Sequence, residues 1–277
     1  TARPARRSAF CAPSIRRQPL KRFKGSLMSL LLNHPVLTIR LFAGVNAASI
    51  LAGFAGLMKS PFFDLTALAA EKFPALKTAA HLEDTSVNGV AGLTVAIDAP
   101  KPAGHIHRSI PDIARMMDES TLTPAARTVA DRIWSVLAAA EASVHNASPD
   151  TVHFHEVGRT ANVVAIGLIT ELFNTLAPET FAVSPVPLTD GIVHCAHGAV
   201  PNPAPSLFAM LKNVPVTAFA GTGEAVTPTG LAILKGLGAQ FGPWPTMTVR
   251  KNLTAYAPGK VFAGAPNGLL FALGEAI

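Results

Sequence analysis

Short apolar segments with strand character alternate with segments of helical character along most of this chain, and this alternation limits the folds open to it. Residues 36–42 form an apolar run and residues 47–58 a stretch rich in small residues, which predicts a buried strand followed by a buried helix. A second strand is predicted at residues 93–97, where glycines precede the apolar run and a proline follows it. The pattern therefore predicts an α/β fold in which helices cover a mixed sheet.

Local capping signals mark where the helices begin. Ser109 is followed three residues later by Asp112, the spacing of a capping box, and Thr123 precedes a proline that would occupy the first helical position. A third helix, at residues 162–176, is apolar nearly all round and should lie in the core, where Trp134 is also expected. The helix after Thr123 should bury one face, formed by residues that recur at intervals of three and four: Val129, Ile133, Val136, Leu137, Ala140 and Val144.

The second half of the chain continues the alternation. Strands are predicted at residues 181–186, 247–250 and 269–273, and helices at residues 206–211 and 229–237. Neither a P-loop nor the glycine fingerprint of dinucleotide-binding folds is present in the sequence. A nucleotide site of either standard kind is therefore not predicted.

Basic residues are concentrated at one end of the chain. The first 63 residues contain no Asp or Glu, whereas eight Lys or Arg residues fall between Arg3 and Lys24. We interpret residues 1–35 as a basic extension and residues 36–277 as one α/β domain, with a loop or linker at residues 99–105. The basic residues expected to contact a partner are Arg3, Arg6, Arg7, Arg16, Arg17, Lys21, Arg22 and Lys24.

The extension is rich in Ala, Ser, Arg and Pro, a composition typical of a mitochondrial or plastid targeting region. It favours a mitochondrial protein, in the matrix or on the matrix side of the inner membrane, with the plastid as the second location. The alternative is a basic arm that binds rRNA or anionic lipid. Charged residues make up only 14% of the chain, which favours a body covered by other protein subunits. No apolar run is long enough to predict a transmembrane span.

Histidine carries the most specific chemical signal. Residues i and i+2 of an extended segment point to the same side, so a His-x-His pair could aim two imidazoles at one site. Glu156 and Glu224 are candidates for additional oxygen ligands, and imidazole suits nickel or zinc. The alternative is that these histidines make ordinary hydrogen bonds in loops. Six of the nine histidines fall in three compact groups: His105/His107, His153/His155 and His194/His197.

A weaker signal lies at Thr227, Thr229 and Gly230, which read as a turn and the beginning of a helix. The amides at such a helix N-terminus could bind an anion. Helix capping alone also explains these residues, so both interpretations stay open.

Several motifs occur in an order and spacing that resemble the LarC family of nickel insertion proteins. The resemblance covers roughly residues 36–277 and implies the α/β fold of the first domain of that family. The motifs, in chain order, are HIHRSIPDI (105–113), EASVH (141–145), HFHEVG (153–158), VSPVPLTDGIVHCAHGAVPNPAP (183–205), EAVTPTGLAIL (224–234), FGPWPTM (241–247) and PNGLLFALGE (266–275).

The resemblance also implies an activity. Members of the family insert nickel into a pyridinium dithiocarboxylate mononucleotide, with CTP and a divalent metal, and carry a second domain associated with CTP binding. This sequence stops where the first domain of the family stops, so we expect the second domain to be absent or supplied separately.

Four positions depart from the pattern of the family. The family opens with a motif resembling DCFSGISGDM, and this chain has Arg40 and Ala48 in place of its two acids. A motif resembling AVDSIVDI follows HFHEVG in the family, and its aspartates are replaced here by Ala161 and Ala165. Aspartates in such motifs commonly hold divalent cations, so their loss would weaken a nucleotide–metal site.

No catalytic residue and no cofactor are therefore expected, apart from nickel or zinc on the retained histidines. The sequence favours a non-catalytic subunit, derived from the LarC family, of a mitochondrial assembly such as the respiratory chain, the ATP synthase or the mitochondrial ribosome. Two alternatives stay open. One is CTP-dependent nickel insertion into the pyridinium mononucleotide, and the other is a metal-binding module.

Overall fold

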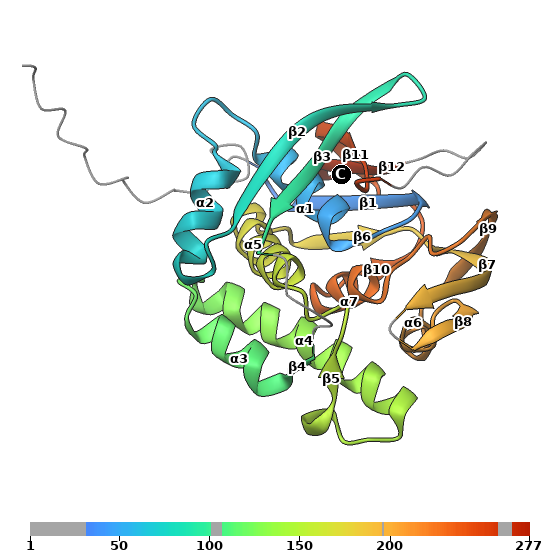
Figure 1. Ribbon diagram of the computed structural model, residues 1–277. Helices are drawn as coiled ribbons and strands as arrows, with labels where there is room; N and C mark the ends of the chain where they lie inside the picture. The colour runs from blue at the N-terminus through green and yellow to red at the C-terminus, as the bar shows by residue number, and fades with distance from the viewer. Residues whose placement is uncertain (1–31, 101–106, 196, 260–267) are drawn as a thin grey trace, which may run out of the picture.

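A seven-stranded mixed sheet with helices packed on it forms the centre of the molecule (Figure 1), as the sequence predicted. The computed structural model describes residues 32–100, 107–195, 197–259 and 268–277. The strand order is β10-β6-β1-β12-β11-β3-β2, in which β1 runs parallel to β6 and antiparallel to β12. The strands are β1 (Pro35–Ala43), β2 (Ala79–Val87), β3 (Val90–Asp98), β6 (Thr180–Val183), β10 (Gln240–Phe241), β11 (Met247–Ala255) and β12 (Gly268–Ala276).

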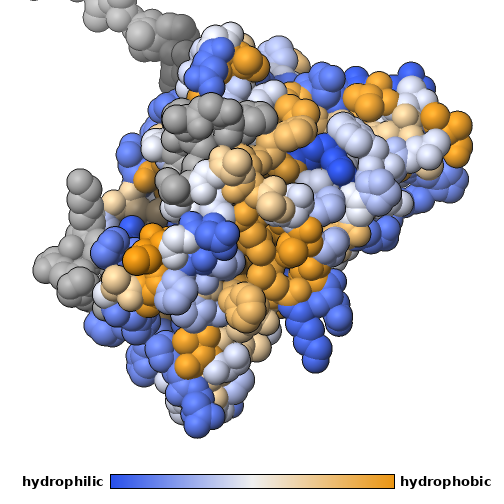
Figure 2. Space-filling view, turned by 90° about the vertical axis from the view of Figure 1, so that its right-hand side faces the viewer, coloured by the Kyte–Doolittle hydropathy of each residue, from blue (hydrophilic) through white to orange (hydrophobic). Residues whose placement is uncertain are grey.

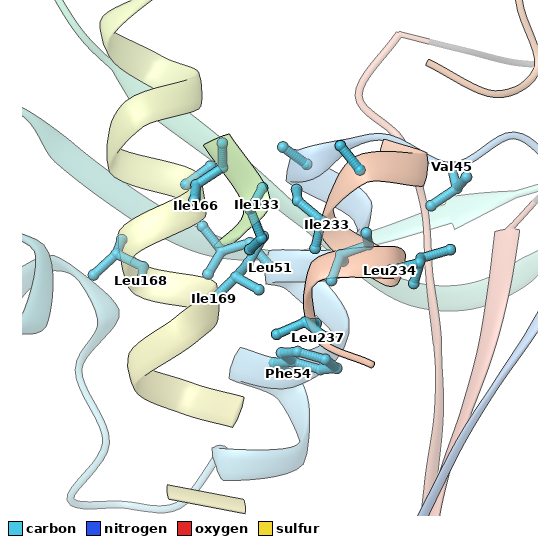
Figure 3. Packing of buried hydrophobic residues seen from close by; sticks show 14 of the residues in the cluster. Val45, Leu51, Phe54, Ile133, Ile166, Leu168, Ile169, Ile233, Leu234 and Leu237 are labelled. Carbon is cyan, nitrogen blue, oxygen red and sulfur yellow. The ribbon is translucent and has the colours of Figure 1, made fainter. Parts of the chain in front are cut away.

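Helices α1 and α5 pack next to each other on the sheet, and α4 lies behind them against α5, α6 and α7. Figure 3 shows how the buried side chains of α1, α4, α5 and α7 meet in one apolar cluster. The helices are α1 (Ala47–Met58), α2 (Leu65–Lys72), α3 (Ile110–Asp118), α4 (Pro124–His145), α5 (Thr160–Leu176), α6 (Pro205–Met210) and α7 (Pro228–Gly236), with short 3-10 turns η2 (Pro74–Leu76) and η3 (Pro149–Thr151).

The small residues of α1 allow the helix to lie directly on the sheet. A Cβ added to Gly53 would come within 2.1 Å of the ring of Phe271 on β12. The rings of Phe54 and Phe271 are 6.0 Å apart at an interplanar angle of 85°, the edge-to-face geometry that aromatic pairs favour. The stretch that the sequence marked as a buried helix is thus buried because glycine permits close contact with the sheet.

The helix starts predicted from capping signals are confirmed. The Ser109 amide donates to Asp112 Oδ2 over 3.0 Å, and Ser109 Oγ accepts from the Asp112 amide over 3.3 Å. The Ser109 hydroxyl also donates to Asp112 Oδ2 over 2.7 Å. The hydrogen bonds that the Ser109 hydroxyl and amide donate to this carboxylate hold the pKa of Asp112 below its usual value. Thr123 caps α4 by accepting from the Ala126 amide over 3.3 Å. Trp134 is buried and packs on Phe154, as expected of a core residue.

Two small sheets complete the described fold. β7 (Val186–Cys195) pairs with β8 (Gly198–Asn202) and β9 (Val216–Thr222), at the right of Figure 1. β4 (Arg108–Ser109) and β5 (His153–Phe154) form a short antiparallel pair. Among the described residues, none of the helices has the length and apolar character needed to span a membrane.

Several predictions about local structure were wrong in detail, among them three with a clear physical reason. The strand predicted at residues 181–186 is two strands, because Ser184 Oγ accepts from the Leu41 amide over 2.8 Å and Pro185 has no N–H for a ladder. Val144 is 38% exposed, because the last turn of α4 leaves the core and lines a cavity. The strand predicted at residues 247–250 continues to Ala255, since β11 pairs along its length with β12.

Candidate functional site

A cavity of about 660 Å³ lies where the first turns of α1, α5, α6 and α7 approach the β7–β8 hairpin and the end of α4. Its volume is in the range typical of small-molecule sites. The helix starts contribute Asn46, Ala47, Ala48, Arg159, Ala161, Asn162, Ala204, Pro205, Ser206, Thr227, Pro228 and Thr229. The remaining described lining residues are Glu141, Val144, His145, His155, Glu156, Val157, Val193, His194, Cys195, His197, Val200 and Glu224.

One wall of the cavity is rich in helix N-termini. The first amides of a helix have no partner within it and carry partial positive charge, so a cluster of helix starts favours an anion. Asn46 caps α1 by accepting from the Ser49 amide over 2.9 Å, and Thr227 caps α7 by accepting from the Gly230 amide over 3.0 Å. Arg159, at the start of α5, makes no side-chain cap and lines the cavity.

The starts of α1 and α7 are tied together by main-chain contacts. The Val45 amide donates to Ala225 O over 2.9 Å, and the Thr227 amide donates to Val45 O over 3.0 Å. A Cβ added to Gly230 would lie 2.5 Å from Val45 O. Gly230 therefore lets the starts of α1 and α7 come together, because any side chain at this position would clash with Val45. This close packing explains why a glycine follows Thr227 and Thr229 in the sequence.

Another part of the lining carries a row of imidazoles. The ring centroids of His155 and His197 are 5.1 Å apart, and those of His197 and His145 are 4.9 Å apart. Cys195 Sγ lies 3.9 Å from His197 Nδ1. His155 Nδ1 is buried and has no hydrogen-bond partner in the described part of the chain, which leaves that atom available to a ligand.

The position of His155 follows from the pairing of β4 with β5. Arg108 is opposite Phe154, so the next pair in this antiparallel register is His107 with His155, whose ring centroids are 4.5 Å apart. Arg108 then holds the following turn, since its guanidinium donates to Gly158 O over 2.6 Å and to Thr160 Oγ1 over 2.9 Å. Burial lowers the pKa of Arg108 from its ordinary value.

Seven of the eleven residues that the sequence marked as metal-ligating or anion-binding candidates line this cavity. They are His155, Glu156, His194, His197, Glu224, Thr227 and Thr229. His153 is exposed and does not line the cavity, so the expected pairing of His153 with His155 is replaced by the cross-strand pair His107–His155. His105 and all eight basic residues of the extension lie outside the described residues.

His145 and Glu141 are lining residues that the sequence analysis did not select. His145 Nε2 lies 3.7 Å from Glu141 Oε2, one helical turn away on the last turn of α4. Both residues belong to the EASVH motif, and their spacing of four residues was a signal that they share a helix face.

The four positions at which the resemblance implies acids lie in different surroundings. Ala48 and Ala161 line the cavity, whereas Ala165 is buried in the core along α5. Arg40 is not a lining residue: it donates to Gly242 O over 3.1 Å and lies 5.3 Å from the ring centroid of Trp244. Burial lowers the pKa of Arg40. Only two of the four replacements therefore change the charge of the cavity wall directly.

The donor types in the cavity fit nickel or zinc, which take imidazole, thiolate and carboxylate ligands. Within the residues that the structure describes, however, no three His, Cys, Asp or Glu side chains stand ready to hold a metal ion together. The imidazoles lie instead in successive neighbouring pairs. Metal binding at this wall would require side-chain rotation or donors from the ligand.

Comparison with known proteins identifies the class to which this fold and cavity belong. Residues 37–276 match the family model described as nickel insertion protein, so the chain belongs to the nickel insertion protein family. It is 40% identical over 215 residues to a putative nickel insertion protein of Geotalea daltonii, a match that covers 75% of this chain and 53% of that protein.

A second relative has a more specific description. The chain is 34% identical over 225 residues to the pyridinium-3,5-bisthiocarboxylic acid mononucleotide nickel insertion protein of Staphylococcus epidermidis, covering 78% of this chain and 55% of that protein. The chain thus spans about half the length of the curated relatives it matches. No solved structure matches it significantly.

Proposed function

We propose that this chain takes part in nickel insertion, and that its cavity holds a nickel ion, as cargo, beside an anionic pyridinium mononucleotide that receives it. One observation supports this proposal. A single cavity of about 660 Å³ is lined both by imidazole and thiol side chains and by helix N-termini. The relative of Staphylococcus epidermidis is described as inserting nickel into such a mononucleotide, which supports the choice of ligand.

The imidazole wall suits the cargo. Nickel binds imidazole and thiolate ligands, and His155, His197 and Cys195 offer both within one small region. Since no three donors of the described chain are prearranged for a metal, the ion would be held by few protein ligands. An ion that must be transferred leaves more easily from a site with few protein ligands than from a fully coordinated one. The reason is that each bond from a protein ligand to the ion has to break during transfer.

The helix N-termini suit the mononucleotide. Its phosphate and carboxylate groups are anionic, and backbone amides at helix starts bind such groups. The first turns of α1, α5 and α7 all line the cavity, and the Arg159 guanidinium adds a positive charge. We therefore place the phosphate on this wall, with the sulfur-bearing ring directed toward the imidazoles.

The test is a nickel insertion assay on the purified full chain with Ni²⁺, CTP and pyridinium-3,5-bisthiocarboxylic acid mononucleotide. The expected product is a nickel-containing mononucleotide, detected by mass spectrometry, which disappears in the His155→Ala/His197→Ala variant. A mononucleotide that fails to bind the chain, measured by calorimetry with and without Ni²⁺, would contradict the proposal. Binding without turnover would retain the site and favour the second candidate below.

The second candidate is a non-catalytic subunit, derived from a first domain of this family, in a mitochondrial assembly. Ala48 and Ala161 favour it, because they line the cavity at positions where the family resemblance implies aspartates. Figure 2 shows apolar surface gathered on the side of β7, β8 and β9, where Ile192, Phe208 and Val216 are exposed and could be covered by other subunits.

Purification of the endogenous protein separates the two candidates. A subunit would elute with stoichiometric partners, and the basic extension would then contact protein, rRNA or anionic lipid. A chain that elutes alone and forms the nickel-containing product would exclude the second candidate.

A further inference from the structure

Arg108 does not line the cavity, yet it holds the segment that supplies four of the lining residues. This segment, residues 155–159, joins β5 to α5 and brings His155 and Arg159 to the cavity. We infer that Arg108 is a positioning residue of the nickel site, which acts by holding His155 in place for the ion. This inference rests on the proposed function, since it assumes that His155 binds the cargo.

The Arg108 guanidinium contacts both the end of this segment and the first residue of α5. It donates to Gly158 O over 2.6 Å and to Thr160 Oγ1 over 2.9 Å. The main chain of Arg108 belongs to β4 and pairs with Phe154, a buried residue whose ring packs on Trp134. A rigid, planar guanidinium that meets two acceptors at once favours a single conformation of the segment.

Asn162, in the first turn of α5, holds the same segment from the other side. Its Nδ2 donates to Glu156 O over 3.0 Å and to Val157 O over 3.2 Å. Arg108 adds the hydrogen bond to Gly158 O, so two side chains bind three consecutive carbonyl groups. The main chain that follows His155 therefore has little freedom to move.

The His155 ring depends on this hold. In metal sites, the imidazole nitrogen that does not bind the ion usually makes a hydrogen bond, which fixes the orientation of the ring. His155 Nδ1 is buried without such a partner in the described part of the chain, so no hydrogen bond at this atom sets the ring angle. The placement of the ring then follows from the main chain, and Arg108 determines that placement.

Positioning and charge predict opposite effects of Arg108 on nickel binding. A cation near the site repels Ni²⁺, so charge alone predicts that removing the guanidinium would tighten binding. The positioning role predicts weaker binding, because His155 would no longer be held where the ion needs it. The sign of the change therefore distinguishes the two effects.

The test is Ni²⁺ binding to the purified full chain and its variants, measured by calorimetry with Ni²⁺ alone. We expect Arg108→Gln to weaken binding about tenfold, the effect typical of a residue that supports a metal ligand. Arg132→Gln is the matched control and should leave the affinity unchanged. Arg132 also donates to a main-chain oxygen, Gly236 O over 3.2 Å, but at the last residue of α7, whereas the first turn of that helix lines the cavity.

A double variant separates positioning from general damage to the fold. If Arg108 acts only through His155, Arg108→Gln/His155→Ala should bind Ni²⁺ as weakly as His155→Ala alone. X-ray absorption of the bound Ni²⁺ should show one imidazole fewer in Arg108→Gln, as in His155→Ala. Thr160→Val removes only one acceptor of the guanidinium and disturbs the fold less, so it should weaken binding by a smaller factor.

Three results would overturn the positioning role while leaving the proposed function intact. The first is unchanged or tighter Ni²⁺ binding in Arg108→Gln. The second is a double variant in which the two losses multiply, and the third is an equal loss in Arg132→Gln. If the unsubstituted chain itself binds no Ni²⁺, the positioning role and the proposed function fail together.

Discussion

The core beneath the seven-stranded sheet and the cavity beside it are built from the same helices, yet they differ in almost every physical property. The middles of α1, α5 and α7 bury apolar side chains in tight contact (Figure 3), whereas their first turns open on a cavity of about 660 Å³. The core gains stability from apolar burial. The cavity gathers polar groups that add little to stability and are suited to a ligand, so stability and binding are separated along single helices.

The largest expected effect lies in the core. Phe271 is fully buried against Phe54, and Phe271→Ala should lower the free energy of unfolding by about 3–5 kcal/mol, since it removes a large ring and leaves a void. Urea denaturation measures this change. If the two regions are separate, the folded fraction of the variant should still bind Ni²⁺ with unchanged affinity. A change in Ni²⁺ affinity comparable to the change in stability would break the separation.

Overpacking the same interface gives the next effect. Gly53→Ala would push a methyl group to within 2.1 Å of the Phe271 ring and should lower the free energy of unfolding by about 1–3 kcal/mol. The matched control is Gly242→Ala, because a Cβ added at Gly242 meets nothing within 4 Å. Thermal denaturation of both variants checks the prediction. Equal loss of stability in the two would show that α1 does not rest tightly on the sheet.

A smaller effect is expected where the two regions meet. Thr227 caps α7 at the cavity and Thr123 caps α4, and replacing either by Ala should lower the free energy of unfolding by about 1 kcal/mol. Only Thr227→Ala should also weaken binding of the mononucleotide, measured by calorimetry, because Thr227 lines the cavity. Equal weakening in Thr123→Ala would mean that the loss comes from general destabilisation.

The smallest effect concerns pH and belongs to the fold alone. Hydrogen bonds from Ser109 lower the pKa of Asp112 in the folded state. The carboxylate therefore contributes stability at pH values above its unfolded pKa, and this contribution is lost as the pH falls through the folded pKa. Asp112→Asn should flatten the acid side of the stability curve, as followed by urea denaturation between pH 7 and the acid range. An unchanged acid side would contradict the assigned capping box.

The core could be predicted from sequence more completely than the cavity, because its signals are local. The starts of α3 and α4 were predicted from the capping residues Ser109 and Thr123. Helix α1 was predicted from its run of small residues. The β7–β8–β9 sheet was not predicted, since its pairing depends on contacts between distant segments. The same reason explains the error about His153: the register of β4 with β5, which no local pattern reveals, makes His107 the neighbour of His155.

The replaced acids show a further limit of sequence reasoning. Arg40, Ala48, Ala161 and Ala165 were grouped as one lost charge cluster, because each aligns with an aspartate of a family motif. Only Ala48 and Ala161 line the cavity, while Arg40 donates to Gly242 O and Ala165 is a core residue. Residues of the same motif therefore lie in different places in the structure. The cavity wall lacks two of the four acidic side chains that the motifs implied, and the other two replacements lie away from it.

Two measurements on the unsubstituted chain and on the His155→Ala/His197→Ala variant test most directly whether binding is separate from stability. Calorimetric titration gives the affinity of each protein for Ni²⁺, and urea denaturation gives its free energy of unfolding. We predict stoichiometric binding to the unsubstituted chain and at least about tenfold weaker binding to the double variant. The free energy of unfolding should stay within about 1 kcal/mol, because neither residue belongs to the apolar core. Equal Ni²⁺ affinity in the two proteins, or no binding to either, would contradict the assignment of the imidazole wall as a metal-handling site.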